Sequence, residues 1–196
     1  MTDKDFDVYL ASASPRRREL LTQIGVRFRV VAVDVIEVPD EGESAQNFVT
    51  RMAVEKAQVG RGNLSSPDKP VLGADTAVVV DNQILGKPRD RAHGLAMLER
   101  LSGRSHEVIS AVALINGETQ TRLNISRVSF RQLNQSEMAA YWQTGEPSDK
   151  AGAYGIQGKA AIFINRLEGS YSGVMGLPLF ETAELLQTAG IRPLRQ

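Results

Sequence analysis

The sequence contains no cysteine, which excludes disulfide bonds, thiolate metal sites and a cysteine nucleophile. This absence is compatible with a reducing compartment. Histidine is scarce as well, since only His93 and His106 are present, and a zinc cluster or a Ser/His triad is therefore hard to build. Metal chemistry would have to use carboxylates, which suit hard cations such as magnesium or manganese.

The sequence also lacks an excess of charge of either sign and any long hydrophobic run. Lysine and arginine number 23, as do aspartate and glutamate, so no net field attracts nucleic acid or an anionic membrane. No apolar run approaches the roughly 20 residues that cross a bilayer. Residues 1–7 lack the basic and then apolar pattern of a signal peptide. We therefore expect a cytoplasmic protein without nucleic-acid or membrane partners.

Strand-like segments alternate with amphipathic helices along the chain, which is typical of an α/β fold. The length of 196 residues favours one compact domain over residues 1–196, with two lobes around a cleft as the alternative. Strands are expected at 8–10, 28–33, 70–80, 84–85 and 160–165, with a hairpin over 106–132. Helices are expected at 15–24, from about 44, at 90–101, at 136–142 and at about 180–188.

A candidate anion site follows the first strand. Ser14 is a good N-cap and Pro15 a good first helical residue, so a helix N-terminus with free N–H groups is expected beside Ser12. Arg16 and Arg17 offer bidentate donors for phosphate oxygens. An ordinary capped helix with a solvated basic first turn would look similar. However, arginines at a helix N-terminus are unfavourable unless an anion binds there, and this favours the anion site.

Two carboxylates, Glu37 and Asp75, each lie close to an apolar, strand-like segment. If they converge from separate strands, they can hold a divalent cation that bridges phosphate oxygens and activates water. Alternatively, Asp75 satisfies N–H groups of a turn and Glu37 is one of several exposed acids.

Two lysines, Lys56 and Lys87, are candidates for neutralising a triphosphate. Lys56 falls on the apolar stripe of the helix expected from about residue 44, so it needs an anionic partner or a route to water. Lys87 precedes a proline and is otherwise a loop residue.

A glycine-rich loop over residues 151–158 contains Gln157. Glycines let a backbone approach a planar ligand, and a glutamine amide both donates and accepts hydrogen bonds. Tyr154 in this loop could stack on a base or pack in the core. Neither a Walker loop nor a G-x-G-x-x-G motif after the first strand is present, so phosphate binding would be built another way.

Six short segments together resemble one known family in their order and spacing. They are residues 10–17, Arg51 with 56–57, 73–76, 86–88, 149–158 and 176–179. The sequence resembles the Maf family of nucleotide pyrophosphatases, which are associated with septum formation. The resemblance implies an elongated α/β fold, with a central mixed β-sheet flanked by helices and a cleft. It also implies a nucleoside triphosphate substrate, a divalent metal cofactor and a homodimer.

The resemblance implies roles for particular residues. Asp75 matches the catalytic base of the family, and Arg16, Thr76 and Gln157 match positions that separate a dTTP and UTP branch from a 7-methyl-GTP branch. In the second branch we expect Trp, Gln and Glu at these positions. A methylated guanine is cationic and suits an aromatic face and a carboxylate. Uracil and thymine are neutral and present one N–H between two carbonyls, which glutamine and arginine match.

The sequence thus predicts a pyrophosphatase that hydrolyses dTTP and UTP, and modified pyrimidine triphosphates as further candidates. Glu37 and Asp75 are expected to hold the metal, and Asp75 serves as base, ligand or both. The residues expected to bind substrate are Ser12, Arg16, Arg17, Lys56, Lys87 and Gln157. The alternatives are a 7-methyl-GTP pyrophosphatase and a regulator of septum formation that binds nucleotides without cutting them.

Overall fold

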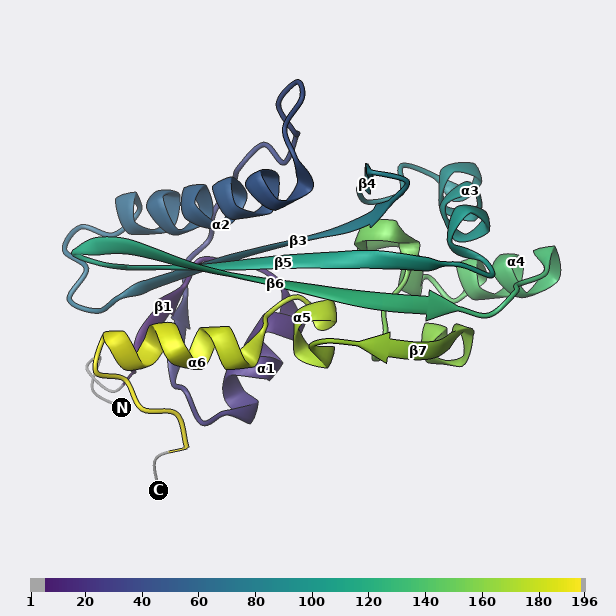
Figure 1. Cartoon of the computed structure of the whole chain (residues 1–196). Helices are drawn as coiled ribbons and strands as arrows, with labels where there is room; N and C mark the ends of the chain where they lie inside the picture. The colour runs from purple at the N-terminus through teal and green to yellow at the C-terminus, as the bar shows by residue number, and fades with distance from the viewer. Residues whose placement is uncertain (1–5, 195–196) are drawn as a thin grey trace.

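The computed structural model describes residues 6–194 and is built on one seven-stranded mixed sheet with the order β2-β1-β3-β5-β6-β7, to which β4 adds by pairing with β3. Strand β1 (Val8–Leu10) runs parallel to both β2 (Phe28–Val30) and β3 (Val71–Val80). The other pairs are antiparallel and involve β4 (Gln83–Leu85), β5 (Ser105–Asn116), β6 (Glu118–Phe130) and β7 (Ile164–Glu168). Strands β3, β5 and β6 run along the length of the elongated molecule (Figure 1).

Helices cover both faces of this sheet. Helix α2 (Ala45–Gly62) lies on one face, and α1 (Pro15–Gln23), α5 (Tyr171–Met175) and α6 (Leu179–Thr188) lie on the other (Figure 1). Helices α3 (Arg91–Leu101) and α4 (Gln135–Gln143) pack together at the far end, close to three short 3-10 helices within residues 146–163. The mixed α/β fold predicted from the sequence is confirmed. Within residues 6–194, no helix combines the length and apolar character that a membrane span requires.

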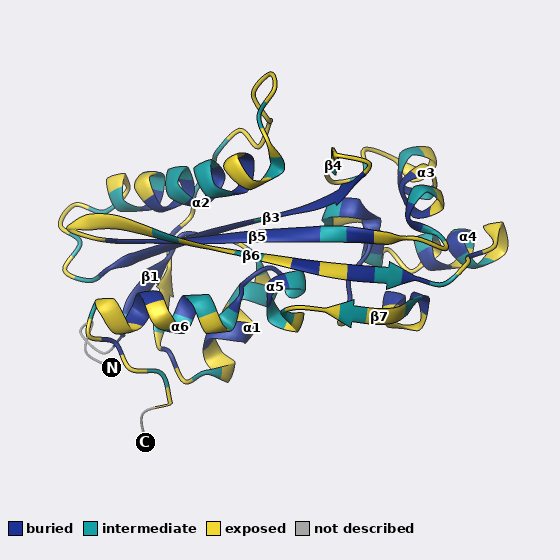
Figure 2. Cartoon of the chain, in the orientation of Figure 1, coloured by how far each residue is buried: buried dark blue, intermediate teal, exposed yellow. Residues whose placement is uncertain are grey.

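The core is divided by the sheet, because successive side chains of a strand point to opposite faces. On β3, Val71 and Ala77 pack against α2, whereas Leu72 and Ala74 pack with residues of α1 and α6. Strands β3 and β5 are buried over most of their length (Figure 2). This explains why β3 is a nearly continuous apolar run, and it makes the polar residues Asp75 and Thr76 within it conspicuous.

The edge of β3 that faces away from β5 is unpaired midway along the strand. Strand β1 pairs with β3 only at Val71 and Leu72, and β4 pairs with it only from Val78 onward. No strand in the described part of the chain pairs with the edge between them. Gly73 lies at the start of this gap, where a Cβ atom would come within 2.2 Å of the Ala53 carbonyl of α2. Glycine therefore allows α2 to approach β3 closely just before Asp75.

Several helix starts follow local capping rules. Ser44 accepts a hydrogen bond from the Asn47 N–H, and Asp90 accepts one from the His93 N–H. Helix α4 starts at a capping box formed by Asn134 and Glu137, slightly before the predicted position. Ser14 occupies the expected N-cap position of α1, but its side chain makes no capping bond.

Two predicted strands differ from the structure. The strand expected over 160–165 is wrong, since Lys159–Phe163 forms a 3-10 helix and β7 follows at Ile164–Glu168. A short apolar run does not by itself distinguish strand from helix, and the Ala161 N–H here bonds to the Gly158 carbonyl in a turn. Strand β2 ends at Val30 rather than at residue 33. Helix α5 had no counterpart among the predicted elements.

Candidate active site

A cleft of about 390 Å³ lies at the open edge of β3. Its size is within the range of small-molecule sites. All of the residues singled out in the sequence line it, namely Ser12, Arg16, Arg17, Glu37, Lys56, Asp75, Thr76, Lys87 and Gln157. They come from segments far apart in the sequence, so the fold gathers them in one place.

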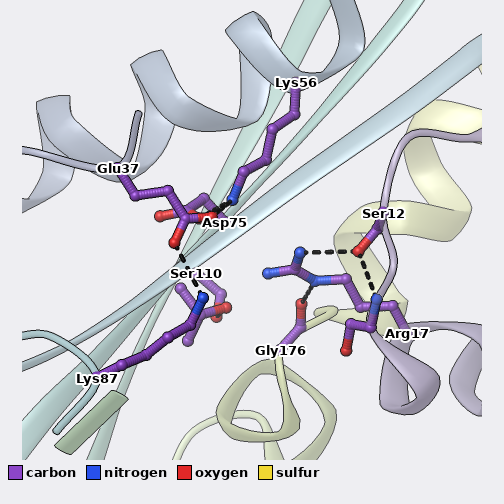
Figure 3. A network of polar contacts seen from close by, with 10 residues as sticks. Ser12, Arg17, Glu37, Lys56, Asp75, Lys87, Ser110 and Gly176 are labelled. Atoms are coloured by element: carbon purple, nitrogen blue, oxygen red, sulfur yellow. Dashed lines mark hydrogen bonds and ion pairs between the residues drawn. The ribbon is translucent and has the colours of Figure 1, made fainter. Parts of the chain in front are cut away.

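A buried lysine joins the two candidate carboxylates. The Lys56 ammonium donates a hydrogen bond of 2.6 Å to Asp75 Oδ1 and one of 2.5 Å to Glu37 Oε1 (Figure 3). Lys56 and Asp75 are each only 6% exposed. Lys56 on the apolar stripe of α2 was expected to need an anionic partner, and it has two, Asp75 and Glu37.

The charges around Asp75 oppose the effect of its burial. Burial raises the pKa of the Asp75 carboxyl, while the positive charges of Lys56 and Arg17 act in the other direction. For Glu37, partial burial acts to raise the pKa, but the hydrogen bond and charge of Lys56 and the charge of Lys87 outweigh it and lower the pKa. Asp75 is thus the carboxyl whose proton affinity is increased.

Glu37 reaches this cluster from a different kind of segment than expected. The sequence suggested two carboxylates on separate strands, but Glu37 lies in the irregular segment between β2 and α2. Its neighbours Ile36 and Val38 are 81% and 61% exposed, so no buried strand holds it. Arg51 of α2 instead binds the Val38 carbonyl at 3.2 Å, and Lys87 donates to Glu37 Oε2 at 3.2 Å.

The β1–α1 turn contributes a fixed guanidinium group. Arg17 Nε donates to the Gly176 carbonyl at 2.8 Å, and Nη1 donates to Ser12 Oγ at 3.2 Å (Figure 3). Burial lowers the pKa of Arg17, and the negative charges of Asp75 and Glu37 oppose this effect only in part. Arg16 also lines the cleft and forms an ion pair of 3.6 Å with Asp149, another cleft residue. Arg17 is therefore held at the cleft, which an ordinary solvated basic turn would not require.

The glycine-rich loop contributes both packing and cleft residues. The Tyr154 hydroxyl is 2.7 Å from His106 Nε2, and the Tyr154 ring packs edge-on against Phe130. Tyr154 is only 5% exposed, so of the two roles considered for it the structure supports packing. A Cβ atom at Gly158 would lie 2.2 Å from Oε1 of Glu146, so a larger residue there would displace the Glu146 carboxylate. The same loop places Gln157 at the cleft.

The cleft has two chemically different sides, because adjacent residues of β3 point to opposite faces of the sheet. Asp75 faces α2 and its lysine, whereas Thr76 faces α5 and bonds to Ser110 of β5. Val78 and Val108 line the cleft on the face of Thr76. The charged cluster and this partly apolar floor therefore meet around the open edge of β3.

The donor set at the charged side fits a hard divalent cation. Among residues 6–194, no group of three or more histidine, cysteine, aspartate or glutamate side chains is arranged to hold a metal. Magnesium is commonly held by one or two carboxylates together with phosphate oxygens of the substrate. Glu37 and Asp75 meet at one ammonium group and supply such a pair.

Two residues that bond to residues of this cleft were not predicted from the sequence. Asp149, the partner of Arg16, lies in one of the segments that resemble the Maf family, which was the signal that could have found it. Ser110 lies behind Thr76 on β5 and had no local signal, because a serine within an apolar strand reveals its partner only through the strand register.

Comparison with known proteins identifies relatives over nearly the whole chain. A family model described as "Maf-like protein" matches residues 7–189. A dTTP/UTP pyrophosphatase of Alkalilimnicola ehrlichii is 57% identical over 183 residues, covering 91% of each chain. One of Methylococcus capsulatus is 52% identical, covering 100% of this chain and 96% of the relative, and one of Bordetella parapertussis is 54% identical, covering 94% and 93%. With the family model spanning every residue of the cleft, the chain belongs to the family of Maf-like proteins.

Proposed function

We propose that this protein hydrolyses dTTP and UTP to the nucleoside monophosphate and pyrophosphate, with modified pyrimidine triphosphates as further substrates. The observation that carries the proposal is the buried Asp75 carboxylate at the cleft, with the cationic groups of Lys56 and Arg17 beside it and Lys87 on the neighbouring Glu37. A carboxylate among cations is suited to water activation beside a polyphosphate. The names of the similar proteins support the same activity.

The metal of this reaction would be held by Glu37 and Asp75, whose oxygens suit magnesium or manganese. When bound, such an ion neutralises phosphate charge and lowers the pKa of a coordinated water. The Lys56 ammonium bonds to both carboxylates, and Lys87 pairs with Glu37 as well.

Asp75 then acts on the attacking water. It accepts a proton from that water as the water oxygen forms a bond to the α-phosphorus. The bond from the α-phosphorus to the bridging oxygen breaks, and pyrophosphate leaves with that oxygen. Burial raises the pKa of Asp75 above that of an exposed carboxyl, which makes its carboxylate a stronger base. Arg17, Lys56 and Lys87 stabilise the negative charge that develops on the leaving group.

The base-binding side favours a neutral pyrimidine. Gln157 is uncharged, and the Tyr154 ring is enclosed by Phe130 and His106 rather than free to stack on a cationic purine. Arg16 and Gln157 can donate to the two carbonyls of uracil or thymine. These features argue against the 7-methyl-GTP alternative, for which an aromatic face and a carboxylate would be needed.

Product analysis tests the proposal. The purified protein is incubated with dTTP, UTP or 7-methyl-GTP and magnesium or manganese in ¹⁸O-labelled water. We expect pyrophosphate from dTTP and UTP, with the label in the monophosphate because water attacks the α-phosphorus. Binding without pyrophosphate release would instead support the regulator of septum formation. Efficient cleavage of 7-methyl-GTP over dTTP would support the other branch.

Asp75→Asn tests the assignment of the base. The amide keeps the size of the side chain, so the variant should fold and bind nucleotide while turnover falls by at least about 100-fold. Near wild-type dTTP cleavage by this variant would reject the assignment. The homodimer implied by the family resemblance and the cytoplasmic location are part of the same proposal, and light scattering of the purified protein tests the first.

A further inference from the structure

Ser110 is a buried hydroxyl behind the cleft that the reaction described above does not use. It is 1% exposed and lies opposite Thr76 in the antiparallel pair of β3 and β5. Its Oγ atom is 2.8 Å from Thr76 Oγ1 and 2.7 Å from the Gly173 carbonyl of α5. Thr76 lines the cleft, whereas Ser110 does not.

The directions of these two hydrogen bonds follow from the atoms involved. A carbonyl oxygen only accepts, so the single hydroxyl hydrogen of Ser110 is directed to Gly173. In the other bond, Ser110 must therefore accept and Thr76 must donate. The Thr76 hydrogen is thus turned away from the cleft toward Ser110. What Thr76 Oγ1 has left for a ligand is acceptor capacity.

An acceptor at this position selects among base edges. Uracil and thymine carry one N–H on the ring, at N3, between two carbonyl oxygens. Cytosine has a lone pair at N3 in place of this hydrogen. Two acceptors that face each other leave both unpaired, which costs more than a lost hydrogen bond between neutral groups.

We propose that Ser110 is a positioning residue for substrate specificity, which fixes Thr76 as the acceptor for the N3–H of uracil and thymine and thereby excludes cytosine. This inference rests on the proposed function, since it assumes that a pyrimidine triphosphate occupies the cleft. Val78 and Val108, which line the cleft on the same face of the sheet, provide the apolar floor beside Thr76.

The test compares binding of UTP and CTP, which have nearly the same shape. Dissociation constants are measured for their non-hydrolysable α,β-methylene analogues, so that the result does not depend on turnover. The wild-type protein should prefer the UTP analogue. In Ser110→Ala the Thr76 hydroxyl is free to rotate and donate to N3 of cytosine, and the preference should fall by about tenfold.

A double-mutant cycle separates this role from a general structural one. Thr76→Val keeps the shape of the side chain and removes its acceptor, so it should also weaken the preference for the UTP analogue. If Ser110 acts through Thr76, adding Ser110→Ala to Thr76→Val should change the preference no further.

Ser126→Ala is the matched control. Ser126 of β6 is also 1% exposed and also binds the start of α5, because its Oγ accepts the Ser170 N–H at 2.9 Å. This variant should lose comparable stability and keep the preference for UTP. Ser110→Ala with an unchanged ratio of the two dissociation constants, or a wild-type protein that binds both analogues equally, would overturn the proposal. Selective binding without any pyrophosphate release would overturn the proposed function alone.

Discussion

Lys56 Nζ lies 2.6 Å from Asp75 Oδ1, and both side chains are nearly inaccessible to solvent. Two charges buried this deeply lose much of their hydration, and their mutual attraction compensates for that loss only while both are present. Glu37 adds a second carboxylate to the same ammonium group. The stability of the protein and the arrangement of its catalytic groups therefore depend on one lysine.

Replacing Lys56 by methionine should destabilise the protein by about 3 kcal/mol, because it leaves the Asp75 charge buried without its counter-ion. Urea unfolding in the presence of a chelator measures this loss. The double variant Lys56→Met with Asp75→Asn should recover most of it, since no uncompensated charge remains at Asp75. Lys87→Met is the control, because the Lys87 side chain is 60% exposed and its removal should change stability little. Equal effects of the two lysine variants would contradict the buried pair.

Arg17→Lys should lower kcat/KM for UTP by about 100-fold, although the charge is kept. Arginine reaches the Gly176 carbonyl with Nε and Ser12 with Nη1, and one ammonium group does not reproduce this fixed geometry. Arg18→Lys, at the neighbouring exposed position, should stay within about twofold of the wild type. Steady-state kinetics on both variants measure this difference. Similar kcat/KM values for the two variants would show that Arg17 has no role in the reaction.

Arg51→Met should reduce activity through Glu37 rather than through direct contact with the substrate. Arg51 binds Glu43 at 2.6 Å and the Val38 carbonyl at 3.2 Å, and its hydrogen bond lowers the pKa of Glu43 to about 2. Losing these bonds frees the segment that carries Glu37. We expect about tenfold lower kcat/KM and a higher metal concentration for half-maximal activity, with little change in the unfolding midpoint.

Arg61→Met on the same helix provides the comparison for Arg51→Met. Arg61 lies in the last turn of α2, whereas the bonds to Glu43 and to the Val38 carbonyl are made by Arg51, so the loss of Arg61 should leave the metal titration unchanged. If Arg51→Met titrates with metal as the wild type does, Glu37 is held by other means.

The stability of the protein should decrease on acidification because of His106. Burial lowers the pKa of His106 to about 4 from its usual 6.5. Between these pH values the unfolded chain binds a proton at His106 that the folded protein does not bind. The contribution of neutral His106 to the free energy of unfolding is therefore complete above about pH 6.5 and is lost as the pH falls toward 4. Between pH 8 and pH 5 this amounts to about 2 kcal/mol.

Urea unfolding of the wild type and of His106→Gln at several pH values isolates this contribution. The glutamine keeps a polar partner for Tyr154 and does not titrate, so its stability should vary less between pH 8 and pH 5 than that of the wild type. Parallel pH profiles for the two proteins would show that His106 is not the group responsible.

Much of the site could be predicted from residue types and local order. The apolar stripe around Lys56 predicted a buried lysine with an anionic partner, and the turn after β1 predicted a guanidinium group beside a helix N-terminus. The alternation of strands and helices predicted an α/β fold, and the family resemblance implied that its sheet is mixed. These features depend on the period of a helix or strand and on capping, which neighbouring residues determine among themselves.

Other features depend on residues that are distant in the sequence. The partner of Thr76 follows from the pairing of β3 with β5, which places Ser110 opposite it. The position of Glu37 follows from Arg51 on a helix that begins only after the segment ends, which is why a strand was wrongly expected to carry it. The apolar run at 160–163 is compatible with both a strand and a helix, and its tertiary contacts favour the helix.

The sequence by itself determined the chemistry available to this protein: without cysteine and with two histidines, its site had to be built from carboxylates, lysines and arginines. Only the tertiary structure decided which of these groups meet. It ended β1 after Leu10, left an edge of β3 open, and brought α2 against Gly73 so that Lys56 reaches Asp75. Such contacts arise from strand register and close packing between distant segments, which no local pattern of residues encodes.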